Sequence, residues 1–165
     1  MKHLINCIIC CAIMLFIISC EKDNDLQMPD MTSSGLNTFG CHVNNELFVH
    51  SYGAGIWGLS SLEAFYDTVQ NPLNIIAHAK NERSIAIQCR NVTVEGEYAF
   101  WHGEYRDKNG KYIFIEDTQN KLFLTRYDRE NLVVSVTFSF KARHEDTGEI
   151  VTISDGRFDI KLEHY

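Results

Sequence analysis

The stretch NLVVSVTFSFKAR, residues 131–143, decides the fold class. Its apolar side chains recur at every second position, and the polar Ser135, Thr137 and Ser139 lie between them. A period of two is the repeat of a β-strand, and one apolar and one polar side indicate an antiparallel strand with one face in a core. The apolar series is Leu132, Val134, Val136, Phe138 and Phe140.

Similar runs recur along residues 37–165, separated by loops that contain Asn, Asp and Gly. They are TFGCHV, ELFVH, LNIIAHA, SIAIQCR, GEYAFWH, KYIFIED, KLFLTRY, EIVTI and RFDIKLEH. The spacing predicts one all-β domain, an antiparallel β-sandwich of about eight to nine strands, with a closed lipocalin-like β-barrel as the alternative. The best helical candidate is one or two turns around SSLEAFYD.

The hairpin expected in LNIIAHAKNERSIAIQC tests the strand register. Ile75 and Ala77 share a face with Ile85 and Ile87 only if the connection has an odd number of residues. We therefore expect a three-residue loop at residues 81–83.

The same parity argument predicts a three-residue loop at residues 128–130.

In the last strand the apolar series changes from odd-numbered positions, such as Ile153, to even-numbered positions, such as Phe158. Both can face the core only if the strand contains one extra residue between them. A bulge or bend is least costly at residues 155–156, because Gly accepts positive φ.

Length and charge limit the classes of function. A chain of 165 residues with 45% hydrophobic content is long enough for one domain with a core. The net charge is −7 and Lys and Arg do not cluster, so we expect no nucleic-acid partner. The same acidic balance disfavours docking on anionic lipid through side chains.

The N-terminus predicts export and lipidation. Residues 4–19, LINCIICCAIMLFIIS, follow a positively charged start and would form a helix of about 24 Å, short of the roughly 30 Å hydrocarbon core. Residues 1–19 are therefore typical of a signal peptide. Residues 17–20, IISC, resemble the bacterial lipobox, which implies that Cys20 carries lipid, becomes the first mature residue and attaches the protein to a membrane.

Residues 20–36, CEKDNDLQMPDMTSSGL, predict an acidic flexible tether, because so few apolar side chains cannot order the segment. Glu21, Asp23 and Asp25 resemble the short acidic signal with which lipoproteins of Bacteroidota reach the outer leaflet of the outer membrane. We expect a lipid-anchored outer-membrane protein exposed on the cell surface, with a periplasm-facing orientation as the alternative.

Only Cys41 and Cys89 remain as thiols of the domain, since the other four cysteines lie in the signal or carry lipid. An exported protein can oxidise such a pair, and closing this loop would stabilise the fold by about 4 kcal/mol in the chain-entropy model. The alternative is two small buried hydrophobic residues. The sequence leaves both open.

Several segments also resemble a family of Bacteroidota lipoproteins of unknown function, whose domains open with a TFGCxVNG motif and close with an ITxGRFDI strand. The matching segments are NTFGCHVNNELFV, LNIIAHAKN, EGEY and VTISDGRFDIKL, and they span essentially residues 37–165. Asn45 stands where the family usually has Gly, and Asn also tolerates the left-handed conformation. The resemblance implies location and fold and transfers no site residue.

No catalytic signature is present, so we expect a protein that is not an enzyme, without a cofactor and without a metal. The histidines never occur at a chelating spacing, and there is neither a nucleophile elbow nor a glycine-rich phosphate loop. Glu95, Glu97 and Glu104 are candidates for an acid–base pair of a glycoside hydrolase, but solvated strand ends are the simpler interpretation.

Aromatic residues are the best candidates for binding. Trp57 and Tyr66 lie in or beside the long connection YGAGIWGLSSLEAFYD, and Trp101 and Tyr105 lie near a strand end beside His102. Such rings stack on sugars or anchor a protein partner. Alternatively, the connection caps the sandwich and buries Trp57 and Phe65.

Asp67-Thr68-Val69 also matches the short pattern for O-glycosylation in Bacteroidota, which would modify Thr68.

Two functions remain open from the sequence. One is a non-catalytic surface binding or adhesion module, accessory to glycan or nutrient capture and meeting a glycan or a surface protein. The other is a lipocalin-like carrier or hydrolase whose site forms only in three dimensions. The oligomeric state stays undetermined.

Overall fold

The computed structural model describes residues 26–51, 61–66 and 72–162, and these form an all-β fold. Cys20, Trp57 and Thr68 lie outside the described residues. The strands of the described part are β1 (Thr38–Val43), β2 (Glu46–Val49), β3 (Leu62–Tyr66), β4 (Leu73–Ala79), β5 (Arg83–Cys89), β6 (Gly96–Tyr98), β7 (Phe100–Asp107), β8 (Gly110–Ile115), β9 (Lys121–Asp128), β10 (Val133–His144) and β11 (Ile150–Lys161).

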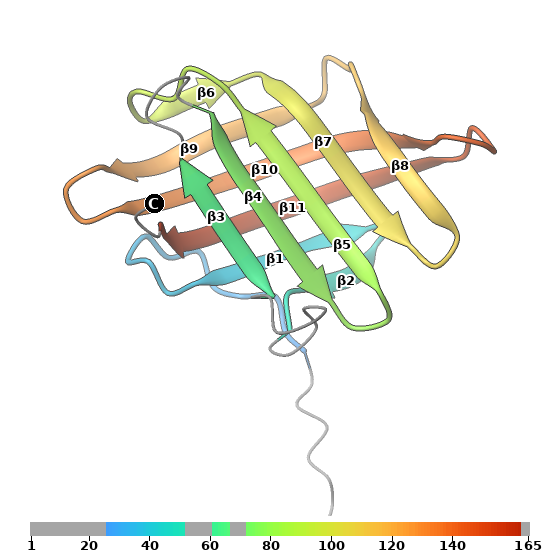
Figure 1. The fold of residues 1–165 in the computed structure, drawn as a ribbon, viewed down its shortest axis with the longest axis horizontal. Helices are drawn as coiled ribbons and strands as arrows, with labels where there is room; N and C mark the ends of the chain where they lie inside the picture. The colour runs from blue at the N-terminus through green and yellow to red at the C-terminus, as the bar shows by residue number, and fades with distance from the viewer. Residues whose placement is uncertain (1–25, 52–60, 67–71, 163–165) are drawn as a thin grey trace, which may run out of the picture.

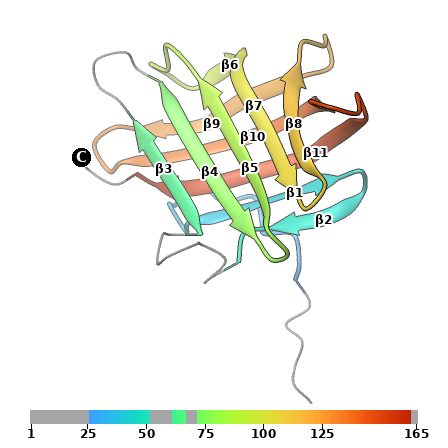
Figure 2. The same ribbon diagram turned by 45° about the vertical axis from the view of Figure 1, so that its right-hand side comes forward.

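These strands form one antiparallel sheet in the order β2-β1-β11-β10-β8-β7-β5-β4-β3, with β9 paired to both β10 and β6. The sheet curls over itself. Strands β3, β4, β5, β7 and β8 make a front layer that crosses a back layer of β9, β10, β11, β1 and β2 (Figure 1). Figure 2 shows the same two layers after a 45° turn.

The all-β prediction is confirmed, and its details need correction. Eleven strands in the described residues, not eight or nine, belong to one sheet rather than to two separate sheets. The closed-barrel alternative also fails for this part of the chain, because β2 and β3 end the pairing path and do not pair with each other.

Strand β10 joins the two layers. One of its edges pairs with β11 over most of its length. The other edge pairs first with β9, from Val133 to Ser139, and then with β8, from Lys141 to His144. Twelve residues extend about 40 Å, which is enough for two neighbours in series. The front layer therefore begins where β8 replaces β9 beside β10.

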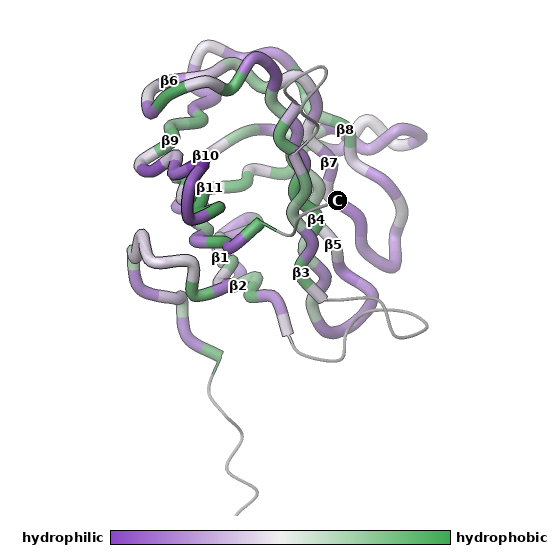
Figure 3. Tube along the Cα trace, turned by 60° about the vertical axis from the view of Figure 1, so that its left-hand side comes forward, coloured by the Kyte–Doolittle hydropathy of each residue, from purple (hydrophilic) through white to green (hydrophobic). Residues whose placement is uncertain are grey.

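The core lies between the layers and is filled with aromatic rings. Phe140 of β10 packs on Phe100 and Phe114 of the front layer, with ring centroids 5.2 and 6.3 Å apart. Phe138 packs on Phe39 and Phe158 of the back layer, at 5.4 and 6.2 Å. Figure 3 shows the two layers edge-on, coloured by hydropathy. Burial of this apolar area is the main stabilising contribution to the fold.

The odd connection predicted between β4 and β5 is confirmed, one residue earlier than expected. Ile75 lies opposite Ile87 and Ala77 opposite Ile85, and residues 80–82 form the turn. Asn81 and Glu82 have φ of 62° and 59°, so the turn uses left-handed conformations that Asn accepts well.

The three-residue loop predicted at residues 128–130 is wrong. Val133 pairs with Asp128, so the loop contains residues 129–132. An even loop would put the apolar side chains of β9 on the wrong face. A bulge at Thr125 restores the phase, and Leu124 lies opposite Val136.

The phase change predicted in the last strand is confirmed. Phe140 pairs with Ile153 and Phe138 with Gly156, so β11 carries an extra residue between them. Asp155 adopts the positive φ, at 52°. Glycine at position 156 is required for a different reason than its conformational freedom, because a Cβ atom there would overlap the Phe138 ring.

The helical turns expected around SSLEAFYD are wrong, because residues 62–66 form β3, paired with β4. Leu62, Ala64 and Tyr66 alternate with Glu63 and Phe65, and this period of two fits an edge strand.

The expectation that residues 20–36 form a flexible tether is wrong for most of residues 26–36, the part of this segment that the structure describes. Asp159 of β11 is 1% exposed, and its carboxylate accepts hydrogen bonds from Thr32 Oγ1 at 2.7 Å and from the amides of Ser34, Gly35 and Leu36 at 2.9, 2.8 and 3.2 Å. Hydrogen bonds to a charged group contribute about 1.5–3 kcal/mol each, which offsets the entropy of ordering a polar segment.

Burial alone would raise the pKa of Asp159, but the hydrogen bonds from Thr32, Gly35, Ser34 and Ser135 outweigh it, so the pKa lies below its usual range. A depressed carboxyl pKa contributes stability above the pKa of the unfolded chain, and this stability is lost as the pH falls through the folded-state pKa. The attachment of residues 32–36 is therefore complete at neutral pH.

Cys41 and Cys89 are free and buried, so the disulfide alternative is not formed in this structure. They lie on β1 and β5, which are not neighbours in the sheet. Burial raises the pKa of the Cys41 thiol far above its usual range and that of Cys89 to about 12. Both are therefore packed as neutral, small hydrophobic groups.

A chain that begins at Leu26 contains only these two cysteines, which allows a direct test. We expect no reaction of the native protein with a thiol reagent such as iodoacetamide, because the thiols are inaccessible and protonated. In denaturant without reductant, mass spectrometry should detect two alkylated thiols. Absence of alkylation in denaturant would instead show that the two cysteines are bonded.

Candidate functional site

The candidate site is the outer face of the front layer, meaning the face directed away from the core. Register and alternation place Phe65, Asn74, Gln88 and His102 in one row across β3, β4, β5 and β7. With strands about 4.8 Å apart, this row is about 14 Å long. Glu63, Ile76, Ala86, Glu104 and Ile113 form the next row.

The first row contains a linked pair of amides. Gln88 Nε2 donates a hydrogen bond to Asn74 Oδ1, so the two side chains hold each other in place. Phe65 flanks this pair on β3 and is 36% exposed. The alternative in which Phe65 is buried under a cap is therefore wrong for this residue.

Trp101 projects from the same face because of a bulge in β7. Cys89 pairs with Phe100 and Gln88 pairs with His102, so Trp101 is the extra residue. Phe100 packs in the core, and a Cβ atom on Gly103 would meet core atoms of Phe114 and Phe140. Two outward residues, Trp101 and His102, therefore lie between two inward ones. Trp101 is 50% exposed.

Arg90 fixes the Trp101 ring. Its guanidinium carbon lies 3.0 Å from the ring centroid, a stacked cation–π arrangement. At exposed sites such a contact contributes about 0.5–1 kcal/mol, enough to favour one orientation of the indole. The ring is thus positioned before any partner arrives.

The charge of Glu104 in the second row is neutralised by neighbouring basic side chains. Glu104 contacts Arg106 Nη2 at 3.0 Å, Lys111 Nζ at 3.4 Å and His102 Nε2 at 3.5 Å. Burial alone would raise the pKa of Glu104, but Arg106 and Lys111 outweigh it, so the pKa lies below its usual range. Glu104 stays ionised at neutral pH and is poorly suited to donate a proton.

The four predicted aromatic residues separate in the structure. Trp101 lies on the outer face, and Trp57 is outside the described residues. Tyr105 is only 4% exposed and packs on Tyr112 at 5.5 Å, which corrects the expectation that its ring contacts a ligand. Tyr66 faces inward, and its hydroxyl donates a hydrogen bond to the Val92 carbonyl at 3.1 Å. The inward side of Tyr105 follows from the bulge in β7, and that of Tyr66 from its place in β3, and neither was predicted from the sequence.

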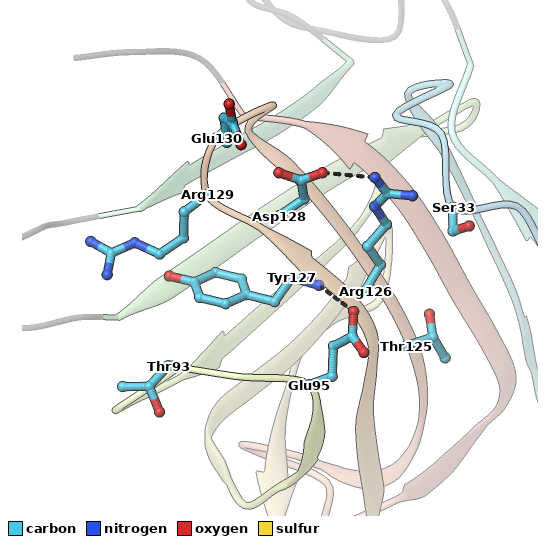
Figure 4. Close-up of a pocket in the computed structure, with 9 residues that line it drawn as sticks. All are labelled: Ser33, Thr93, Glu95, Thr125, Arg126, Tyr127, Asp128, Arg129 and Glu130. Carbon is cyan, nitrogen blue, oxygen red and sulfur yellow. Dashed lines mark hydrogen bonds and ion pairs between the residues drawn. The ribbon is translucent and has the colours of Figure 1, made fainter.

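A hollow of about 540 Å³ lies at the end of β9. Figure 4 shows its lining, with Arg126 Nη2 on Asp128 Oδ2 at 2.7 Å and the Tyr127 amide donating to Glu95 Oε1 at 3.4 Å. The Arg129 guanidinium points away from the Arg126–Asp128 pair (Figure 4). Of the charged groups that line the hollow, Glu95, Arg126 and Asp128 are therefore engaged in these contacts.

The three glutamates considered for glycoside cleavage do not form one site. Glu104 is on the outer face of the front layer, whereas Glu97 is exposed on β6, which pairs with β9 of the back layer. Glu95 lies in the hollow at the end of β9.

Among residues 26–51, 61–66 and 72–162 no three His, Cys, Asp or Glu side chains gather as metal ligands. The same part of the chain contains no helix that is long and apolar enough to cross a membrane. Comparison with protein-family models, with curated proteins and with solved structures finds no match to this chain.

Sequence reasoning missed Asn74, Gln88 and Arg90, and it placed Phe65 under a cap. The predicted parity of the β4–β5 connection put Asn74 and Gln88 on the same face, but the predicted loop at residues 81–83 would pair Gln88 with Ile76, whereas the observed turn pairs it with Asn74. The bulge that exposes Trp101 has no sequence signal, since it follows from where Phe100 and Gly103 must pack. The Arg90 contact follows from that bulge.

Replacing Arg90 should loosen Trp101 without disturbing the core. In a Trp57→Phe background only Trp101 emits, because the chain has two tryptophans. We expect Arg90→Ala to cost at most about 1 kcal/mol and to increase quenching of Trp101 by acrylamide. Arg106→Ala, on the same face but bonded to Glu104, is the control and should leave quenching unchanged. Equal quenching in the parent and Arg90→Ala would contradict the stack.

Proposed function

We propose that the chain is an outer-membrane lipoprotein, anchored through Cys20, whose domain is a non-catalytic binding module exposed on the cell surface. The likeness to Bacteroidota lipoproteins and the lipobox support the anchoring. The observation that carries the binding role is the outer face, where a half-exposed, oriented Trp101 borders the row of Phe65, Asn74, Gln88 and His102.

A glycan is the ligand class that this face favours. Aromatic rings contact the apolar faces of sugars, and the Gln88 amide and the His102 imidazole can exchange hydrogen bonds with hydroxyls. Asn74 is only 6% exposed, so its role is to position Gln88. On the β7 side of the row the carboxylate of Glu104 is paired with Arg106 and Lys111, so a neutral chain lying there meets no unpaired carboxylate. A surface protein that inserts an apolar side chain beside Trp101 is the second partner class, which corresponds to adhesion.

A lipocalin-like carrier or a hydrolase is less well supported. A carrier needs an enclosed cavity, whereas rings of both layers fill the core between them. A hollow of about 830 Å³ does lie between the β4–β5 and β7–β8 turns, bordered by Tyr105, but its lining is mostly polar or charged, with Arg83, Asp107 and Lys108. A hydrolase needs converging catalytic groups, and the carboxylates weighed for that role are separated.

The binding proposal is tested with a glycan array probed by a soluble domain that begins at Leu26. We expect binding to neutral glycans and a loss of at least about tenfold in affinity for Trp101→Ala, because a central stacked ring contributes more than 1.4 kcal/mol. Phe123→Ala is the matched control, since Phe123 is 47% exposed in the back layer. Equal losses in both variants, or no glycan binding at all, would refute the glycan role.

The location is tested on intact cells that produce the full chain. We expect the wild type to remain with the membrane fraction and to be cut by external protease, whereas Cys20→Ser should be released from the membrane because it cannot be acylated. A periplasmic marker protein that stays intact controls for leakage. Protection of the domain on intact cells would place it on the periplasmic side and end the proposal of surface exposure.

A further inference from the structure

Residues 28–37, here called the N-terminal strap, are part of the domain. Asp159 accepts four hydrogen bonds from the strap and a fifth from Ser135 Oγ of β10 at 2.8 Å. With an exposed fraction of 1%, this carboxylate is nearly closed off from solvent. Peeling the strap away would remove four of the five hydrogen bonds to this carboxylate, each of which contributes about 1.5–3 kcal/mol.

Other contacts hold both ends of the strap. Pro29 and Met28 lie so close to Gly40 of β1 that a Cβ atom there would overlap the Pro29 ring. Asn37 Oδ1 accepts a hydrogen bond from the Lys161 amide of β11 at 2.9 Å. The strap therefore crosses β1 and β11 on the outer face of the back layer.

The strap changes the reach of the proposed lipid anchor. The sixteen steps from Cys20 to Leu36 would span about 53–58 Å when extended, whereas the eight steps from Cys20 to Met28, where the contacts with β1 begin, span at most about 29 Å. A domain held at Met28 cannot stand as far from the bilayer as a free tether would allow.

The place where the described chain begins selects an edge of the domain. In Figures 1, 2 and 3, which differ by rotation about the vertical axis, the described chain starts below the sheet, on the same side as the turn between β4 and β5. The connection between β8 and β9 lies at the opposite, upper edge (Figure 1).

We infer that the Asp159-held strap keeps the edge with the β4–β5 turn toward the lipid surface, so that the outer face of the front layer stands upright from the bilayer. The inference rests on the proposed anchoring at Cys20. The lipid surface is the partner that the geometry selects, because the short length of chain before Met28 keeps this edge nearest to the anchored Cys20. A ligand would then approach Trp101 from the side of the protein.

Fluorescence transfer in vesicles tests this orientation. The full-length, lipidated protein is reconstituted in phosphatidylethanolamine–phosphatidylglycerol vesicles with a headgroup acceptor dye. A donor is placed at Lys80→Cys in the β4–β5 turn or at Thr118→Cys in the upper connection, both exposed positions. The native Cys41 and Cys89 are buried and do not compete for the label. We expect clearly higher transfer from position 80 than from position 118.

Asp159→Asn should release the strap, because the amide puts donors where the strap amides need an acceptor. Transfer from position 80 should fall and the difference between the two positions should shrink. Asp155→Asn is the matched control, since it makes the same change on the same strand at a side chain that is 74% exposed. Gly40→Ala is a second variant for the case that Asp159→Asn fails to fold. Its methyl group displaces Pro29 without changing Asp159, so it should also loosen the strap.

Hydrogen exchange in the same full-length proteins separates the possible failures. Release of the strap should speed exchange of the Ser34, Gly35 and Leu36 amides at least tenfold, whatever happens at the membrane. If the protein does not stay on the vesicles, the proposed anchoring at Cys20 is refuted, and the orientation that rests on it fails as well. Anchored protein with equal transfer from both positions, or with transfer unchanged when exchange shows the strap released, refutes the orientation alone.

Discussion

The register of β10 is the constraint on which both layers depend. Every even residue of this strand, from Val134 to His144, is buried, so one phase is kept over its whole length. A slip of one residue would turn Phe138 and Phe140 to solvent and bring polar side chains into the core. Because β11, β9 and β8 all pair with β10, these neighbours must adapt to it.

The neighbours adapt through bulges, and the candidate site is a consequence of one more. Thr125 in β9 and Asp155 in β11 absorb the residues that would otherwise break the apolar face. In β7, Phe100 and Gly103 must both face Phe140, and three residues apart they cannot do so in a regular strand. The bulge that resolves this conflict exposes Trp101, so core packing creates the candidate surface.

Alternation and parity predicted much of the fold, because they depend only on side chains a few positions apart. They predicted the inward residues of β10, the odd connection between β4 and β5, and the phase change at residues 155–156. They could not predict that β8 follows β9 along β10, since that depends on contacts between distant segments. The edge strand β3 was mistaken for helical turns. The strap was mistaken for a tether because its order depends on Asp159, which lies 124 positions after Gly35.

The two outer faces of the sheet differ, and the end motifs of the sequence explain why. In RFDI, Phe158 and Ile160 enter the core while Asp159 holds the strap, and in TFGC, Gly40 leaves the space that Pro29 occupies. Both motifs therefore serve the attachment of the strap to the back layer, which is a structural requirement rather than a ligand site. The front layer has no corresponding cover within the described residues, and there the sequence places an oriented tryptophan and a row of hydrogen-bonding groups. In the proposed binding role, the residues that distinguish one partner from another are those of the Trp101 bulge and its row.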